Sequence, residues 1–144
     1  MKKNILLVSF LLITLFLSAC GSSASPAATE AASVSSLALF QIIKPDGTKF
    51  DVTLEAVKTL PLAQVTAEGK VEEGPYLSDI LALAGVTEFT EVTLTGSSNP
   101  ATLTFDQVDE NTILDFNNHG TMKLASTYIP KANWTKDVAE IVVK

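Results

Sequence analysis

A long apolar run near the start of the chain ends directly at its only cysteine, and this limits where a folded domain can lie. Residues 4–19 are almost continuously apolar and follow a basic start at Lys2 and Lys3. A basic segment, an apolar segment and small residues before a cut are the layout of a secretory signal peptide. The run has about 16 residues, fewer than the roughly 20 that a membrane-spanning helix needs. We therefore predict a signal peptide over residues 1–19.

The end of the run resembles the lipobox of bacterial lipoproteins. Its residues are Leu17, Ser18, Ala19 and Cys20. In that family the cysteine thiol receives a diacylglycerol, the peptide is cut just before the cysteine, and the new amine is usually acylated. The resemblance implies lipidation of Cys20 with diacylglycerol and a fatty acid such as palmitate. It also implies an extracytoplasmic location, with the lipid holding the protein at the cell membrane of a bacterial envelope. An ordinary signal peptide or a transmembrane anchor is the alternative.

The mature chain that this cleavage would leave is acidic and has the length of one domain. Removing 19 of the 144 residues leaves 125, with 8 lysines against 16 acidic residues and a net charge of −8. An acidic surface repels nucleic acid and anionic headgroups. We therefore expect no nucleic-acid partner, and membrane attachment through acyl chains. With one cysteine, no disulfide can form within the chain, so stability must come from a packed core.

The composition changes after Cys20. Residues 21–36 are small and polar, and they contain too little apolar surface to fold. We predict that residues 20–36 are a lipidated cysteine and flexible tether. Residues 37–144 then form the folded domain.

One helix and many short strands are expected in this domain. The helix is predicted over residues 76–84, where apolar residues recur at i, i+3, i+4 and i+7, with Pro75 at its start and Gly85 just past its end. Short helical segments are predicted at 54–60 and 106–110, and strands at 37–43, 48–54, 62–68, 91–95, 101–105, 112–116, 121–126 and 138–143. This content predicts an α+β fold with a mainly antiparallel sheet.

A series of motifs resembles the oxidoreductase molybdopterin-binding domain, the sulfite-oxidase-like fold. Residues 74–86 are similar to the family's "G-x-x-L-x-D-x-L-x-x-A-G-V" core. Further similar segments, in the family's order, are residues 50–61, 91–95, 113–120 and 129–143. The likeness extends over residues 37–144 and implies the fold of that family.

The chain departs from the catalytic members of that family in the residues that do the chemistry. Those members bind molybdenum through a cysteine thiolate, and they hold the pterin phosphate and oxyanion substrate with arginines and histidines. This chain has one histidine, no arginine, and a single cysteine that we predict to be lipidated. Residues 120–124 lack the proline and arginine of the family's "G-x-P-x-R-l" motif. Because soft thiolate ligands retain such metals, we expect no cofactor, and molybdopterin is implied by the fold resemblance alone.

Five residues are candidates for ligand binding if the family's cleft persists. They are Tyr76, Asn118, His119, Lys123 and Trp134. A lysine in a small pocket can receive an anionic or carbonyl ligand. Core packing is the alternative for Trp134, and an exposed turn is the alternative for His119.

No metal site is expected. His119 has no second imidazole or thiolate to complete a transition-metal site. The acidic pairs at residues 72–73 and 109–110 lack the ordered spacing of a calcium loop, so we predict that their carboxylates are solvated.

Three functions remain open at this level. The first is a lipid-anchored, non-catalytic domain that binds a small ligand or a protein partner at the membrane surface. The second is an active molybdopterin-dependent oxidoreductase, or an electron-transfer subunit of one. The third is a surface interaction or adhesion module that uses exposed strand edges.

Overall fold

The computed structural model describes residues 37–144. The predicted signal peptide (1–19), the lipobox, the predicted lipidation at Cys20 and the tether up to residue 36 lie outside the described residues.

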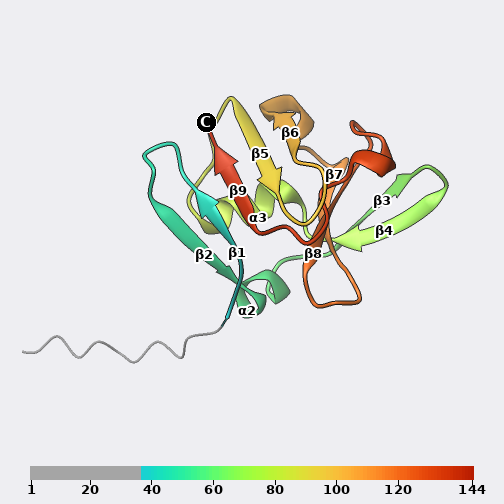
Figure 1. The fold of residues 1–144 in the computed structure, drawn as a ribbon, viewed down its shortest axis with the longest axis horizontal. Helices are drawn as coiled ribbons and strands as arrows, with labels where there is room; N and C mark the ends of the chain where they lie inside the picture. The colour runs from blue at the N-terminus through green and yellow to red at the C-terminus, as the bar shows by residue number, and fades with distance from the viewer. Residues whose placement is uncertain (1–36) are drawn as a thin grey trace, which may run out of the picture. The chain divides into compact units, whose positions relative to one another are not determined.

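Residues 37–144 form an α+β fold in which strands predominate, as the sequence predicts (Figure 1). The elements are β1 (Ala38–Ile43), β2 (Lys49–Thr53), α2 (Leu54–Lys58), β3 (Ala63–Ala67), β4 (Lys70–Gly74), α3 (Leu77–Leu83), β5 (Glu91–Thr95), β6 (Ala101–Thr104), η1 (Phe105–Gln107), β7 (Thr112–Phe116), β8 (Met122–Ser126), η2 (Lys131–Asn133) and β9 (Glu140–Val143). Every predicted strand is present. The short strand β4 and the single turn η2 are additional to the prediction.

Five strands form the main sheet, in the order β2-β1-β9-β5-β6. Strands β1 and β9 run parallel, and the other neighbours are antiparallel, so the sheet is mainly antiparallel. The parallel pair places Ile42 opposite Ile141, and both side chains are fully buried. Alternation with a period of two turns one face of each strand toward the core.

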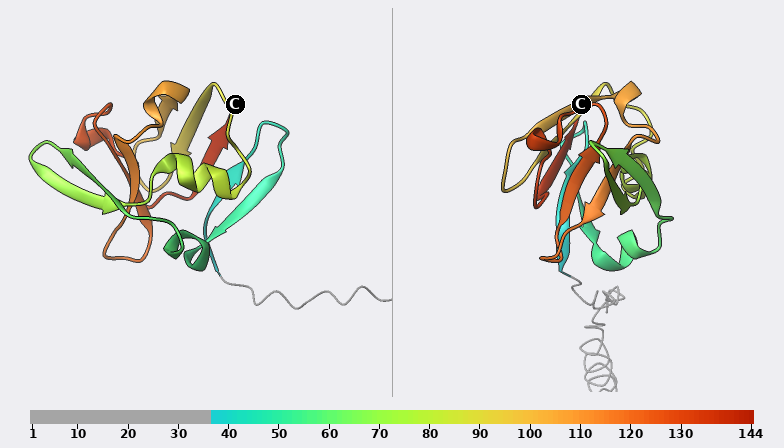
Figure 2. Two further views of the ribbon diagram at one scale, coloured as in Figure 1. Left: turned by 180° about the vertical axis from the view of Figure 1, so that it is seen from behind. Right: turned by 90° about the vertical axis from the view of Figure 1, so that its right-hand side faces the viewer.

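Helix α3 covers one face of this sheet (Figure 2, left). Leu77, Ile80 and Leu81 are fully buried, which is the apolar stripe that the sequence predicts. Gly85 ends the helix with φ of +72°, and its N–H donates to the carbonyl of Ala82 at 2.9 Å. In the part of the chain that the structure describes, no helix is long and apolar enough to cross a membrane.

The hairpin of β3 and β4 extends away from the main sheet (Figure 1). The sequence does not predict β4, because its glutamates and lysine have low β-propensity. The turn that joins the strands has positive φ at Glu68 (+49°) and Gly69 (+76°), as a tight primed hairpin turn requires. Val65 lies opposite Glu72 in the register, so both side chains point to the same face.

The hairpin of β7 and β8 lies between the first hairpin and the main sheet (Figure 1). The free edge of β8 bonds to the segment that leads into β9. Leu124 N–H donates to the Thr135 carbonyl at 2.9 Å, and Val138 N–H donates to the Met122 carbonyl at 2.8 Å. A small second core lies between the two hairpins, formed by Val65, Ala67, Ile113, Ala125 and Trp134.

Candidate functional site

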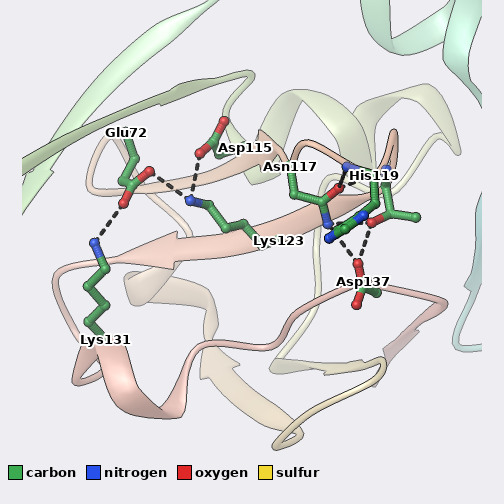
Figure 3. A network of polar contacts seen from close by, with 8 residues as sticks. Glu72, Asp115, Asn117, His119, Lys123, Lys131 and Asp137 are labelled. Carbon is green, nitrogen blue, oxygen red and sulfur yellow. Dashed lines mark hydrogen bonds and ion pairs between the residues drawn. The ribbon is translucent and has the colours of Figure 1, made fainter.

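Four charged side chains meet where the two hairpins face each other, and we call them the ion-pair cluster (Figure 3). Glu72 lies between two lysines, with Oε2 at 2.8 Å from Lys123 Nζ and Oε1 at 2.8 Å from Lys131 Nζ. Lys123 Nζ is also 3.0 Å from Asp115 Oδ2. The carboxylates are the more buried partners, since 12% of the Glu72 side chain and 15% of the Asp115 side chain are exposed.

Four separate elements bring these groups together. Asp115 on β7 lies directly opposite Lys123 on β8, an opposite-charge pair that stabilises an antiparallel ladder. Glu72 comes from β4, on the face that looks toward β8. Lys131 comes from η2, whose first N–H donates to the Glu68 carboxylate at 3.1 Å.

The pKa values of the cluster follow from burial and from these contacts. Burial raises the pKa of Glu72, but hydrogen bonds from Lys123 and Lys131 outweigh it and lower the pKa to about 2. Burial is the largest cause of the raised pKa of Asp115; Glu72 adds to the rise and Lys123 opposes it. Burial lowers the pKa of Lys123, but the hydrogen bonds to Glu72 and Asp115 raise it overall. The positive charges of the cluster are therefore balanced by carboxylates of the same domain.

A second polar cluster surrounds Asp137, before β9 (Figure 3). Asp137 accepts hydrogen bonds from the hydroxyls of Ser97 and Thr121 and, at 2.7 Å, from the amide of Asn117. The bond from Ser97 is the largest cause of the lowered pKa of Asp137, and Thr121, Asn117 and the charge of His119 lower it further. The backbone of Asp137 has φ of +47°, which is uncommon for a residue with a side chain. These bonds hold the loop in that conformation.

Two of the predicted site residues lie in the exposed turn between β7 and β8. Asn118 and His119 are both exposed, and the His119 N–H donates to Asn117 Oδ1 at 2.8 Å. His119 therefore lies in an exposed turn, which was the alternative to ligand binding for this residue. It lies beside the Asp137 cluster and not beside the ion-pair cluster (Figure 3).

Tyr76 and Trp134 pack on the second core. Trp134 is 2% exposed, and its Nε1 donates to the carbonyls of Ser126 at 3.1 Å and Ile129 at 3.0 Å. Tyr76 packs partly buried against the same core. Trp134 is thus a core residue, which was the alternative to ligand binding for this side chain. Lys131 Nζ lies 5.1 Å from the centre of the Trp134 ring, within range of a cation–π contact.

The structure does not gather the five predicted residues around one rim. Lys123 lies in the ion-pair cluster, and the cluster reaches the Trp134 ring only through Lys131. The prediction of solvated carboxylates holds for Glu73 but is wrong for Glu72, because β4 turns that side chain inward. Glu72, Asp115 and Lys131 belong to the cluster but were not predicted from the sequence as site residues. The signal for Glu72 would have been the position of β4 next to β8. That position could not be predicted because β4 itself was not predicted.

A hollow of about 400 Å³ lies next to the cluster, between the end of the β3–β4 hairpin and the segment that follows β8. Its lining includes the side chains of Glu68, Tyr128 and Lys131. This volume is within the range of small-ligand sites. Among residues 37–144, no group of three or more histidine, cysteine, aspartate or glutamate side chains could hold a metal ion.

The residues present do not fit a molybdopterin cofactor of the kind that the family resemblance implies. The described domain contains no cysteine that could supply a thiolate, and the whole chain contains no arginine. Both lysines of the ion-pair cluster, Lys123 and Lys131, already pair with carboxylates, at 2.8–3.0 Å. The site offers neither a soft metal ligand nor an unbalanced positive charge for a phosphate.

Comparison with known proteins supports the fold and leaves the chemistry open. No family model matches the sequence, and no curated protein matches it. Among solved structures, the chain is similar to the sulfane dehydrogenase SoxCD from Paracoccus pantotrophus, with 17% identity and a TM-score of 0.54. The match covers 72% of this chain and 37% of that chain. At this identity the match shows a distant likeness of fold.

Proposed function

We propose that this chain is a lipid-anchored, extracytoplasmic, non-catalytic binding domain built on a sulfite-oxidase-like scaffold. The lipobox at residues 17–20 supports the anchor, and the fold likeness supports the scaffold. In this proposal the domain binds a small ligand or a protein partner at the membrane surface.

One observation carries the non-catalytic part of the proposal. Glu72 binds Lys123 and Lys131 simultaneously, at 2.8 Å each. The two lysines of the ion-pair cluster are therefore held by the domain's own carboxylates and are not free to receive a phosphate or an oxyanion. Charges arranged in this way stabilise a fold, and they leave no preorganised excess of positive charge for an anion.

The hollow of about 400 Å³ beside Lys131 is the place where a small ligand would bind. Its lining combines the apolar residues Ile129 and Pro130 with residues that carry hydroxyl groups, among them Thr66, Thr127 and Tyr128. Such a mixture suits a small polar organic molecule better than a free anion.

A second candidate is an active molybdopterin-dependent oxidoreductase or a subunit of one. The fold likeness to a dehydrogenase favours it. It would need metal ligands from outside residues 37–144, because that range has no cysteine.

Metal analysis separates the two candidates. The full-length chain would be expressed in bacteria that synthesise molybdopterin and purified in detergent. Molybdenum would be measured per chain, with a known molybdoenzyme from the same cells as the positive control. We expect far less than one molybdenum atom per chain. One atom per chain, with pterin, would overturn the non-catalytic proposal.

Metabolic labelling tests the anchor independently. Cells that make the full-length chain would receive a palmitate analogue that can be detected on a gel. We expect label on the natural chain and on the control Ser22→Ala, and none on Cys20→Ala. Label that persists in Cys20→Ala would overturn the assignment of Cys20.

A further inference from the structure

An apolar groove with an acidic surround lies beside α3, and it shares no residue with the ion-pair cluster. The groove has a volume of about 220 Å³. Its apolar lining comes from Leu81, Ala82, Val86, Phe89, Phe105 and Val108. Figure 2 (left) shows α3 in front of the sheet, with the turn that follows β6 above it.

Two phenylalanines form one wall of the groove. The rings of Phe89 and Phe105 meet edge to face, with centroids 5.0 Å apart and planes at 63°. Phe105 is nevertheless 49% exposed, although most large apolar side chains of residues 37–144 are buried. A rigid, half-exposed aromatic side chain beside a groove is typical of the anchor of a binding surface.

The charges beside the groove are mainly negative, although Lys44 lines an adjoining hollow that shares Val86 and Thr87 with the groove. Between Lys70 and Lys123, the sequence has nine acidic residues and no lysine or arginine. Four of the nine directly adjoin groove residues along the chain: Asp79, Glu88, Asp106 and Asp109. None of these four takes part in the ion pairs found within residues 37–144, and only Asp109 among them accepts side-chain hydrogen bonds there, from Asn111 and Tyr128. Their negative charge is therefore available to a partner.

We infer that this groove binds a basic segment of a protein partner, which inserts one apolar side chain between Phe105 and α3. The volume is below the roughly 300–1,000 Å³ of drug-sized ligand sites and suits a single side chain. Lysines or arginines on either side of that side chain would complement Asp106 and Glu88, and complementary charge favours both specificity and association.

Two other occupants fit the surface less well. A second copy of this chain would bring the same acidic rim against itself in a two-fold contact, which places like charges together. An anionic membrane surface would be repelled by the same carboxylates. The inference depends neither on the lipid anchor nor on the ligand of the hollow beside Lys131.

Fluorescence anisotropy of a labelled peptide tests the inference. The probe is GKKLFKKG, titrated with the full-length chain in a zwitterionic detergent, with detergent alone as the blank. The control peptide GEELFEEG has glutamates in place of the lysines. The control peptide GKKGGKKG has glycines in place of the apolar anchor. We expect GKKLFKKG to bind at least about tenfold more tightly than either, and to weaken as salt is raised.

Three variants locate the binding. Phe105→Ser and Asp106→Lys should each weaken binding of GKKLFKKG by about tenfold or more. The control Glu55→Lys makes the same charge change at an exposed position in α2, outside the groove, and should leave the affinity unchanged. Thermal unfolding of each variant checks its fold, and Asp106→Lys keeps the test valid if Phe105→Ser is unstable.

Several results would overturn the inference. One is equal binding of all three peptides, and another is equal weakening by Glu55→Lys and Asp106→Lys, which would indicate unspecific attraction. A dimer that Phe105→Ser converts to a monomer would show that a second copy occupies the groove. Binding to anionic vesicles that Phe105→Ser abolishes would assign the groove to a membrane.

Discussion

Glu72 on β4 and Lys123 on β8 form a 2.8 Å ion pair between residues 51 positions apart in the sequence. The pair joins the extended β3–β4 hairpin to the body of the domain, and Lys131 contacts the other carboxylate oxygen of Glu72. Because the carboxylate is largely withdrawn from water, the contact is worth more than an exposed surface pair, although the lysines remain partly exposed.

Removing the shared lysine should destabilise the domain. Lys123→Met leaves Glu72 and Asp115 close together without the cation between them, and we expect a loss of about 1–2 kcal/mol in the free energy of unfolding. Urea unfolding of the full-length chain measures it. Lys136→Met is the matched control at an exposed lysine outside the ion pairs, and it should be neutral. Equal effects of the two variants would show that the cluster contributes nothing.

The stability of the domain should fall in acid because of Glu72. Its pKa in the folded protein, about 2, is below the ordinary value of 4.5. The stabilisation is therefore complete above pH 4.5 and is lost as the pH falls from there toward 2. The raised pKa of Asp115 works in the opposite direction, since protonation of Asp115 favours the folded state, and it offsets part of the loss.

Urea unfolding at pH 6 and pH 3 tests this dependence. Glu72→Gln should lower stability at pH 6 and reduce the difference between the two pH values. Glu73→Gln, at the neighbouring exposed position, should keep the difference of the natural chain. A pH dependence that is unchanged in Glu72→Gln would contradict the assignment.

Gly74 should tolerate no side chain, because β4 ends against β7 there. A Cβ on Gly74 would lie 2.0 Å from the Leu114 carbonyl oxygen, which is backbone and has little room to move. We expect Gly74→Ala to cost more than about 2 kcal/mol. The control Gly69→Ala changes a glycine with φ of +76° and open space, so it should cost only about 1 kcal/mol. Chemical unfolding compares them; a smaller loss for Gly74→Ala would contradict the close approach.

Trp134 should behave as a core residue. Trp134→Phe keeps an aromatic ring but removes the donor to the Ser126 and Ile129 carbonyls, and we expect a loss of about 1–3 kcal/mol. Trp134→Ala should cost about 3–5 kcal/mol. Since Trp134 is the only tryptophan, its emission should shift to longer wavelength on unfolding. Emission typical of exposed indole in the folded protein would place the side chain outside the core.

Much of the fold could be predicted from local patterns. The stripe of α3 and the alternation of the strands identify elements, because burial on one face imposes a period on the sequence. Strand β4 has no such pattern. Three of its five residues are charged, and β4 exists because Glu68 and Gly69 make a tight turn that returns the chain beside β3. A strand stabilised by its partner leaves little trace in its own sequence.

The candidate site shows the same division. Lys123 could be selected from the sequence, but Glu72 and Lys131 could not, because they reach it from elements far apart in the chain. Trp134 could be placed either at a rim or in the core, and only the packing of the two hairpins around it decides for the core.

The amino-acid sequence by itself determined the chemical inventory of the domain: no arginine anywhere, no cysteine after residue 20, and an acidic balance. It also determined the positions of α3 and most strands, because these depend on neighbours along the chain. The tertiary structure alone decided that Glu72 holds two lysines and that Phe105 borders an open groove. The physical reason is that ion pairs and grooves form between segments distant in sequence, whose proximity depends on the packing of the whole core.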